Sequence, residues 1–346
     1  MAFDDPPGPD RRPARPTLEV VAHRAGVSRA TASRVIRGAT NVSPEARDAV
    51  FRAADELAYT VNRAARALAT RRSDSVAFIV AEDEGRMFND PYFLGVLRGA
   101  HAEISGAGLQ LLFVIASTPT DVQHFEQYAS GGHVDGVLLI SLHGDDSLPR
   151  NLEAMGVATV LNGRPVSGDE SIYWVDSDNS TGGRLATEML IARGARRIAT
   201  ISGPQDMAAG RDRLAGYRAA LVAAGLDPLE EHVAQGDFTV DGGTRAMARL
   251  LDADPDIDAV FAASDLTALG AMQTLADRGR AVPGDVAVVG FDDVPEAQLA
   301  TPPLTTIRQP IDEVGRTMAR VLLGRIRGAA QRTTVLPVQA VRRDSA

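Results

Sequence analysis

The sequence predicts an α/β protein in which a small helical head precedes a larger body built on parallel sheets. After Ser75, apolar runs rich in β-branched residues alternate with helical segments, which is typical of parallel strands covered on both faces. The alternation restarts near Arg197 and therefore indicates two successive α/β subdomains. The chain has 346 residues, and because single cores stop growing at roughly 250–300 residues, we expect at least two folding units.

The ends and the composition of the chain exclude several classes of protein. Residues 1–16 are rich in proline, aspartate and arginine and lack the apolar core of a signal peptide, so we expect a disordered leader. The longest apolar runs are far shorter than the roughly 20 residues needed to span a bilayer, and no membrane segment is expected. The sequence contains no cysteine, which excludes disulfides and thiolate metal sites.

Charge is distributed unevenly along the chain. Residues 11–72 contain 13 arginines and five acidic side chains, whereas the residues after Ser75 contain 23 arginines and 36 acidic side chains. A basic segment fused to an acidic body, in a chain of net charge −9, favours a head that binds a polyanion such as nucleic acid. On charge alone, a solvated charged face is the alternative.

Three predicted helix starts mark the head, at Thr17, at Ser28, and at Ser43 followed by Pro44. Two short helices joined by a tight turn at Gly26, with a third helix closing the core, are a helix-turn-helix unit. The side chains expected to form its core, from their helical spacing, are Val20, Val21, Ala25, Ala32, Val35, Ile36, Val50, Phe51, Ala54 and Leu57.

The second helix of such a unit enters the major groove with its N-terminal residues against base edges. Arginine can make a bidentate contact to guanine, and small hydroxyl residues suit phosphates or thymine methyls. A helical bundle that binds protein is the alternative. The predicted DNA contacts of the head are Thr17, Ser28, Arg29, Ala30, Thr31, Ser33, Arg34 and Asn41.

Residues 62–75 predict a short helix and a linker after the head. Asn62 can cap this helix, and Leu68 is its only large apolar side chain, so it has almost nothing to bury in a monomer. The segment is therefore either a flexible linker or an element that orders only with a partner. Two such helices side by side in the minor groove could insert leucines between base steps and kink the duplex.

The stretches TLEVVAHRAGVSRATASRVIRG (17–38) and VSPEARDAVFRAADELAYTVNRAARALA (42–69) closely resemble the lactose-repressor family of bacterial transcription regulators. The resemblance implies a homodimer that binds a near-palindromic operator through paired recognition helices and paired hinge helices. Carried over by position, Arg29, Ala30 and Arg34 would read bases, and the hinge residues would be Asn62, Ala65 and Leu68. A tyrosine and a glutamine stand in the lactose repressor itself where this chain has Arg29 and Ala30, so its operator sequence is not implied here.

The resemblance extends along almost the whole chain and implies that the body has the periplasmic-binding-protein-like fold. In that fold the chain crosses three times between two subdomains, here near Asp176, near 306–310 and near Leu336, and an effector binds in the cleft. The domains expected are a leader (1–16), a helix-turn-helix DNA-binding domain (17–61), a hinge helix with its linker (62–75) and an effector-binding and dimerisation domain (76–346).

Ligands of open α/β sheets bind beyond the carboxyl ends of the strands. Arg213, at the start of a helix, can offer a planar fork to vicinal hydroxyls or to a carboxylate. Asp265 and Asp293 are explained equally well as helix caps, and Trp174 as a core residue. The other candidates near predicted strand ends are Phe88, Asn89, Asp90, Tyr92, Ser141, Asn162, Arg164, Asp176, Ser264 and Asp292, with Gln309 on a crossing strand.

In the family, the positions that match Asn162, Arg213, Phe238, Ser264, Asp292 and Gln309 often contact the effector. Phe238 would supply an apolar face, and Arg213 and Asp292 would clamp hydroxyls. We therefore expect a sugar or sugar derivative as effector, with a purine-type corepressor as the alternative. The predicted effector-binding residues are Phe88, Asn89, Tyr92, Ser141, Asn162, Arg213, Phe238, Ser264, Asp265, Asp292 and Gln309.

No catalysis, metal or cofactor is expected. None of the six histidines lies in an HExxH pattern, and the sequence has neither a GxxxxGK[ST] loop nor a GxGxxG motif after a strand. A secreted solute-binding protein with the same body fold would need an export signal and would have no use for the basic head. The chain ends without the leucine-rich tail that makes the lactose repressor a tetramer, so we expect a cytoplasmic dimer.

Overall fold

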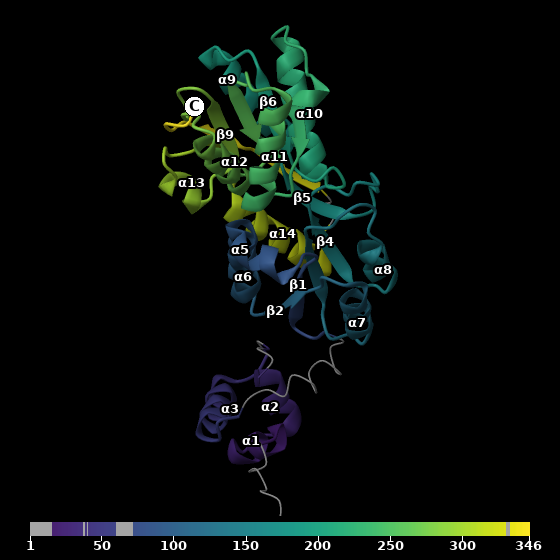
Figure 1. Cartoon of the computed structure of the whole chain (residues 1–346). Coiled ribbons are helices and arrows are strands. Elements are labelled where there is room, and N and C mark those ends of the chain that lie inside the picture. Colours follow the sequence, from purple (N-terminus) through teal and green to yellow (C-terminus); the bar gives the residue numbers. More distant parts are fainter. Residues whose placement is uncertain (1–15, 37–38, 40, 60–71, 330–332) are drawn as a thin grey trace, which may run out of the picture. The chain divides into compact units, whose positions relative to one another are not determined.

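The computed structural model describes residues 16–36, 39, 41–59, 72–329 and 333–346. The chain divides into two compact units, Met1–Ser73 and Asp74–Ala346, which we call the head and the body (Figure 1). The predicted hinge residues Asn62, Ala65 and Leu68 lie outside the described residues. Within the described part of the chain, no helix is both long enough and apolar enough to cross a membrane.

The head contains three helices, α1 (Leu18–Arg24), α2 (Arg29–Ile36) and α3 (Pro44–Glu56). The three predicted caps are confirmed by the backbone amides that their hydroxyls accept. The amide of Val20 donates to Thr17 Oγ1 at 3.4 Å, that of Thr31 to Ser28 Oγ at 3.1 Å, and that of Ala46 to Ser43 Oγ at 3.3 Å. Gly26 has a φ of +67° in the turn between α1 and α2, where a side chain would be strained.

Two residues predicted for the core of the head are exposed instead. Val20 is 45% exposed and Phe51 is 47% exposed. Each lies one residue away from the buried stripe of its helix, because positions separated by three or four residues share a face and adjacent positions do not. The buried core of the head consists of Val21, Ala22, Ala32, Val35, Val50, Ala53 and Ala54.

The body contains two six-stranded sheets, one in each of its two subdomains. The sheet of the first subdomain has the order β11-β5-β4-β3-β1-β2, and all of its neighbouring strands are parallel. Its strands are β1 (Ser75–Val80), β2 (Gln110–Ile115), β3 (Gly136–Ile140), β4 (Ala158–Asn162), β5 (Tyr173–Ser177) and β11 (Thr333–Leu336).

The sheet of the second subdomain has the order β12-β10-β9-β8-β6-β7. It is parallel except at its edge, where β12 runs antiparallel to β10. Its strands are β6 (Ile198–Ser202), β7 (Val233–Gln235), β8 (Ala259–Ala262), β9 (Ala287–Asp292), β10 (Thr305–Arg308) and β12 (Gln339–Val341). The predicted α/β body with parallel sheets is therefore confirmed.

Helices cover both faces of each sheet, as the apolar character of the strands requires. In the first subdomain, α6 and α14 pack on one face, and α7 and α8 on the other. In the second subdomain, α11 and α12 pack on one face, and α9 and α10 on the other. The helices of the body are α5 (Glu84–Asn89), α6 (Pro91–Gly106), α7 (Pro119–Ser130), α8 (Leu148–Ala154), α9 (Asn179–Arg193), α10 (Ala208–Ala223), the 3-10 helix η1 (Glu230–His232), α11 (Val240–Ala253), α12 (Asp265–Asp277), α13 (Pro295–Leu299) and α14 (Ile311–Ile326).

The chain crosses between the subdomains from β5 to α9, from β10 to α14 and from β11 to β12, close to the three positions that the resemblance implies. Helix α14 packs closely on α6 because both helices carry a glycine at the contact. A Cβ on Gly315 would lie 2.0 Å from the carbonyl oxygen of Val96, and one on Gly99 would lie 1.9 Å from that of Asp312. These glycines therefore hold the returning chain tightly against the first subdomain.

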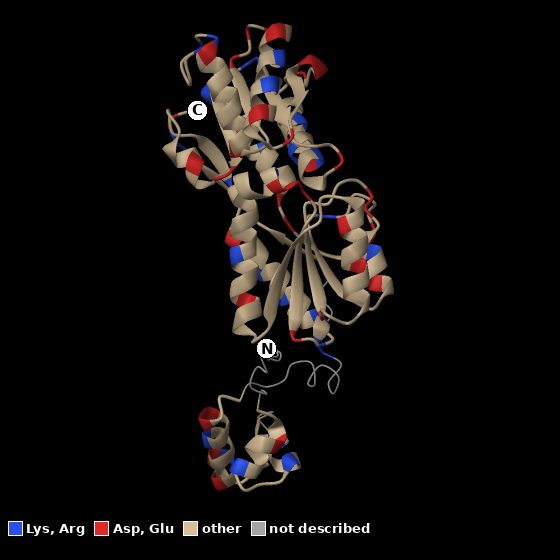
Figure 2. Ribbon diagram, turned by 60° about the horizontal axis from the view of Figure 1, so that its bottom comes forward, with Lys and Arg blue, Asp and Glu red and all other residues tan. Residues whose placement is uncertain are grey.

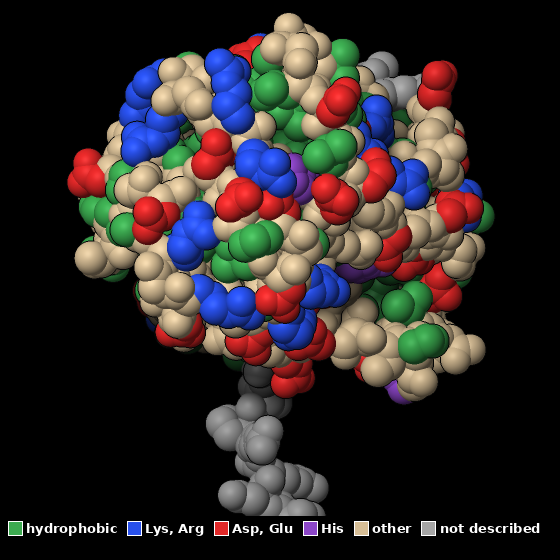
Figure 3. Space-filling model, turned by 45° about the horizontal axis from the view of Figure 1, so that its top comes forward, with side chains coloured by type: hydrophobic (Ala, Val, Ile, Leu, Met, Phe, Trp, Pro, Cys, Tyr) green, Lys and Arg blue, Asp and Glu red, His purple; other side chains and the backbone are tan. Residues whose placement is uncertain are grey.

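Charged residues are nearly excluded from the strands and lie on helices and loops (Figure 2). Among the described strands, the charged residues are Asp176, Asp292 and Arg308, each at or next to the carboxyl end of its strand. On the face of the molecule shown in Figure 3, acidic and basic side chains are interspersed. The charges within the sheets are thus concentrated where the two subdomains meet.

Candidate ligand cleft and DNA-reading helix

A cavity lies between the two subdomains, at the carboxyl ends of their strands. The space between the atoms that line this main cavity, including its open mouth, is about 960 Å³. Pockets for small molecules typically measure roughly 300–1,000 Å³, so the main cavity has the size of a ligand site. Its polar lining includes Asp90, Tyr92, Ser141, Asn162, Asp176, Asn179, Arg213, Asp292 and Gln309.

Arg213 is the centre of a buried polar cluster in the second subdomain. Its Nε donates to Asn179 Oδ1 at 2.8 Å, one Nη donates to the carbonyl oxygen of Ala263, and the same Nη lies 3.5 Å from Asp292 Oδ1. Its guanidinium lies over the ring of Phe291, with 3.6 Å between the Cζ atom and the ring centroid. Arg213 is only 5% exposed, so these contacts fix its charge at the wall of the cavity.

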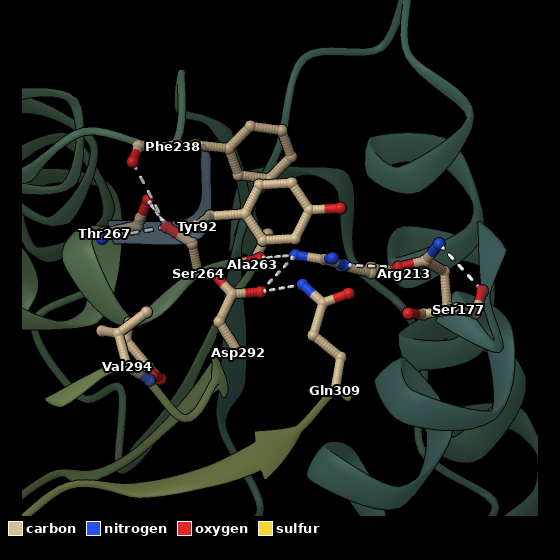
Figure 4. Close-up of polar contacts among 12 residues, drawn as sticks. Tyr92, Ser177, Arg213, Phe238, Ala263, Ser264, Thr267, Asp292, Val294 and Gln309 are labelled. Carbon is tan, nitrogen blue, oxygen red and sulfur yellow. Dashed lines mark hydrogen bonds and ion pairs between the residues drawn. The ribbon is translucent and has the colours of Figure 1, made fainter. Parts of the chain in front are cut away.

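Asp292 and Gln309 complete this cluster (Figure 4). Gln309 Nε2 donates to Asp292 Oδ1, and Figure 4 shows both side chains directed toward Arg213. Burial raises the pKa of Asp292 to about 7, although the nearby guanidinium of Arg213 and the amide of Gln309 favour its ionised form. The carboxyl group is therefore costly to ionise in the folded body.

A second buried carboxylate, Asp176, lies where β5 leaves the first subdomain. Asn179 Nδ2 donates to Asp176 Oδ1 at 2.9 Å, and because Asn179 also accepts from Arg213, it connects the two groups. Burial raises the pKa of Asp176 to about 6. Burial also raises the pKa of Asp90, which lies at the N-terminus of α6. The cavity therefore holds three carboxyl groups that are costly to ionise.

The opposite wall comes largely from the first subdomain. The hydroxyl of Tyr92 donates to Asn162 Oδ1 at 2.9 Å, and Asn162 Nδ2 reaches the carbonyl oxygen of Val175 at 3.4 Å. Figure 4 shows the rings of Tyr92 and Phe238 on the same side of the Arg213 cluster. The two rings give the cavity an apolar surface opposite its hydrogen-bonding groups.

Three residues of the main cavity have left-handed backbone conformations without being glycine. Their φ angles are +62° at Ser141, +63° at Phe238 and +118° at Asp292. Such conformations cost of order 1–3 kcal/mol each and persist where the surrounding structure enforces them. Their concentration at the carboxyl ends of the strands supports a functional role for this part of the cleft.

Contacts between the subdomains close one side of the cleft. Arg164 Nη2 lies 2.7 Å and 2.9 Å from the two carboxylate oxygens of Asp212. The ring of His143 lies between Glu82 of the first subdomain, at 3.1 Å, and Asp206 of the second, at 2.9 Å. Hydrogen bonds to these two carboxylates raise the pKa of His143. The subdomains are thus joined by charged contacts that can open without disturbing either core.

Seven of the predicted effector residues line the main cavity: Tyr92, Ser141, Asn162, Arg213, Phe238, Asp292 and Gln309. The structure places the other four elsewhere. Phe88 is 61% exposed, and Asn89 lines a neighbouring cavity. Ser264 caps α12 and reaches the carbonyl oxygen of Phe238 at 3.4 Å, so it supports the Phe238 loop.

Asp265 also lies away from the cavity. It is fully buried, accepts from the amide of Val294 and from the hydroxyl of Thr306, and so ties α12 to β10 and to the segment after β9. Asp293, the other aspartate that the sequence explains equally well as a helix cap, pairs with Arg308 and Arg343. Trp174 packs against an apolar cluster of the first subdomain, as the core interpretation expects.

Among the lining residues that the sequence did not indicate are Arg86 and Asn179. Asn179 is the first residue of α9 and follows Asp176 by three positions, which is a signal that could have been used. Arg86 lies on the short helix α5 within an acidic stretch, and no periodicity or motif marks it.

In the head, the predicted base-reading residues lie at the surface. Arg29, Ala30 and Arg34 on α2 are exposed, as are Thr17, Ser28 and Asn41, and Thr31 and Ser33 are half-buried. Arg29 approaches Glu19 at 3.4 Å, with both side chains largely exposed, and such surface pairs contribute little to stability. The arginines of α2 are therefore available to a nucleic acid.

Comparison with known proteins agrees with this organisation. Residues 17–62 match the family of bacterial regulatory proteins called the lacI family, and residues 187–346 match the periplasmic binding protein-like domain. The chain is 52% identical over 333 residues to the HTH-type transcriptional regulator CelR of Thermobifida fusca, which covers 95% of this chain and 96% of that protein. It is 35% identical to the ribose operon repressor of Escherichia coli K12, with 90% and 93% covered.

Two solved structures resemble the whole chain. A complex of the transcriptional regulator CelR with cellobiose has a TM-score of 0.78 at 48% identity and covers 96% of this chain and 100% of that one. The lac repressor dimer bound to operator and the anti-inducer ONPF has a TM-score of 0.82 at 28% identity, with 95% and 98% covered. The fold and the head thus define a DNA-binding transcriptional regulator. The chain belongs to the LacI family, and the resemblance stated from the sequence is confirmed.

Proposed function

We propose that this protein is a repressor that binds a palindromic operator as a homodimer and releases it when a neutral disaccharide of the cellobiose type occupies the main cavity. The observation that carries the proposal is the buried cluster of Arg213, Asp292 and Gln309 facing the rings of Tyr92 and Phe238. A CelR protein that is 48% identical over nearly the full chain forms a complex with cellobiose, which supports the same class of ligand.

The charges of the cavity favour a neutral polyol over an anion. Burial raises the pKa of Asp90, Asp176 and Asp292 around the space, and an anionic ligand would add a further charge that is costly to bury there. Much of the guanidinium of Arg213 is already engaged by Asn179, Ala263 and Asp292. Sugar hydroxyls can both donate to carboxylates and accept from the remaining N–H groups, so a sugar satisfies this lining without adding charge.

Each side chain then has a proposed role. Asp292 accepts from two sugar hydroxyls, Arg213 and Gln309 donate to sugar oxygens, and Tyr92 and Phe238 cover the apolar faces of the sugar rings. Asn162 and Ser141 complete the hydrogen bonds from the first subdomain. Because the lining comes from both subdomains, a bound sugar favours one relative arrangement of the two, and in this way changes the affinity for DNA.

On the DNA side, Arg29, Ala30 and Arg34 are proposed to read bases, and Thr17, Ser28, Thr31, Ser33 and Asn41 to contact the backbone or flank those contacts. The proposed hinge contacts are Asn62, Ala65 and Leu68. The dimer is supported by the lac repressor dimer on its operator, which the chain resembles over 95% of its length. We propose that this regulator catalyses no reaction and that it acts in the cytoplasm, where its operator DNA lies.

A purine corepressor is the second candidate, because two aromatic rings face the cavity and the chain is 33% identical to the purine repressor PurR of Erwinia tasmaniensis. The test is selection of bound duplexes from a random DNA pool, repeated with cellobiose, glucose, glucose 6-phosphate and guanine. We expect a palindrome whose recovery cellobiose abolishes. Loss with glucose 6-phosphate alone, or a gain with guanine, would overturn the proposed effector, and recovery of no motif would overturn the regulatory function.

A further inference from the structure

Arg86 lies at the edge of the main cavity and has a role that the proposed function leaves open. It is on α5, whose start is capped by Asp83 Oδ1 accepting from the Arg86 amide at 3.0 Å. The guanidinium lies between two rings from different subdomains, 5.7 Å from the centroid of Phe93 and 5.5 Å from that of Phe238. Its side chain is 12% exposed and pairs with Glu82.

A second cavity adjoins the main one at this position. It contains about 1,110 Å³ between its lining atoms, again including an open mouth. The two cavities share Arg86, Asp90 and Phe238. The segments around the starts of α5, α11 and α12 supply the remaining lining, which includes Asp83, Asn89, Asp237, Thr239 and Asp241. Arg86, together with Asp90 and Phe238, thus lies where the two cavities adjoin.

The guanidinium of Arg86 has an unused donor. Its Nε is buried and has no hydrogen-bond acceptor among the described residues. Burying a donor without a partner costs free energy, and an arginine can only donate, so the missing partner must be an acceptor. The rings of Phe93 and Phe238 contact the guanidinium but cannot satisfy its in-plane N–H groups. Because Nε itself is fully enclosed, a ligand hydroxyl in the cavity would accept from the Nη groups of the same guanidinium.

We propose that Arg86 is a specificity-determining residue that ends the effector cavity at α5, donates to the terminal sugar of a disaccharide, and thereby excludes longer sugars of the same series. This inference rests on the proposed sugar effector. Removal of the side chain joins the two cavities, and a third sugar unit then enters the second one, where Asp237, Thr239 and Asn89 offer polar partners.

The test is titration calorimetry of the full chain with cellobiose and with cellotriose. We expect the protein to bind cellobiose at least about tenfold more tightly than cellotriose, because the longer sugar meets the Arg86 side chain. In Arg86→Ala, cellobiose binding weakens about tenfold and the preference disappears or reverses. Arg86→Met keeps most of the side-chain volume without the donors. In this variant the affinity for both sugars falls, and the preference for cellobiose over cellotriose stays.

Arg249→Ala is the matched control, because Arg249 is an exposed arginine of α11 and lines neither cavity; both affinities should stay unchanged. If Arg86→Ala lowered the affinities for both sugars by the same factor, or changed neither affinity, the proposed limit on sugar length would be overturned. The proposed sugar effector would stand in either case. If the unsubstituted protein bound neither sugar, the proposed effector itself would fail. Should Arg86→Ala not fold because Glu82 loses its arginine partner and keeps only Ser141 and His143, the double variant E82Q/R86A carries the same expectation.

Discussion

The head and the body hold their functional residues in opposite environments. In the head, the arginines of α2 are exposed while a small aliphatic core lies beneath them. In the body, Arg213 is 5% exposed and Asp292 is 7% exposed, so the groups proposed to bind the effector are themselves buried. Function in the head can therefore change without loss of stability, whereas in the body function and stability depend on the same side chains.

The largest effect is expected at Asp292, where the two properties should move in opposite directions. Asp292→Asn removes charge-assisted hydrogen bonds worth roughly 1.5–3 kcal/mol, so effector affinity should fall about 10- to 150-fold. The pKa of Asp292 is raised to about 7 in the folded body, above its ordinary value of 3.8, so the folded state loses stability as the pH rises from about 4 to 7. The variant should therefore be more stable than the parent at pH 8.

Calorimetric titration with cellobiose and urea unfolding at pH 8 and pH 4 test this expectation. The gain in stability should be much smaller near pH 4, because the carboxyl group is then protonated in the folded state and close to half protonated in the unfolded state. A variant that was less stable than the parent at pH 8 would show that the ionised Asp292 stabilises the body.

Arg34→Ala in the head should change DNA recognition without changing the stability of the protein. The exposed side chain makes only a long contact, 3.5 Å, to the carbonyl oxygen of Ala30, so the melting temperature should stay the same. Discrimination at one base pair of each half-site should fall by about 1–3 kcal/mol. Sequencing of selected duplexes measures this change, and an equal loss of affinity for all sequences would instead identify Arg34 as a phosphate contact.

Effector binding in the body should depend on pH through Asp292, whereas the exposed arginines of the head stay charged. Sugar hydroxyls donate to the ionised form of Asp292, and burial raises the pKa of this group to about 7, so effector affinity should rise from pH 6 to pH 8. Calorimetry across this range measures the slope. His143→Gln is a suitable control, because hydrogen bonds to Glu82 and Asp206 raise the pKa of His143 but this residue does not line the main cavity, and the variant should keep the slope. A flat profile would mean that Asp292 does not accept from the effector.

The smallest expected effect concerns the cap of α3. Ser43→Ala removes the acceptor for the amide of Ala46 and should lower the stability of the head by about 1 kcal/mol. Hydrogen exchange of the full chain should show faster exchange across α3 and no change in the body. Thr118→Ala, which removes the equivalent cap of α7, should do the reverse. Faster exchange in both units with either variant would show that the head and the body unfold together.

The head was easier to predict from the sequence than the cleft, for a physical reason. Caps and turns are local, so Thr17, Ser28, Ser43 and Gly26 could be located from a few neighbouring residues. The errors at Val20 and Phe51 were errors of one position around a helix.

In the body, the expectation that ligand groups follow the strands identified four residues that line one cavity: Tyr92, Ser141, Asn162 and Asp292. Gln309 was expected on a crossing strand, Arg213 at a helix start, and Phe238 only from the family resemblance. The same expectation could not separate Asp292 from Asp265, because the direction of the Asp265 side chain depends on how α12 packs against β10. Arg86 was missed because its place between Phe93 and Phe238 depends on the approach of two subdomains that are far apart in the sequence.

The central claim is that the body and the head are coupled through the effector. The most direct measurement is the affinity of the full chain for cellobiose, by calorimetry, with and without a saturating operator duplex, together with operator affinity with and without saturating cellobiose. Linkage requires the two ratios to be equal, and we expect operator to weaken cellobiose binding by the same factor, about 5- to 150-fold, by which cellobiose weakens operator binding. Cellobiose affinity that is identical with and without operator would contradict the claim.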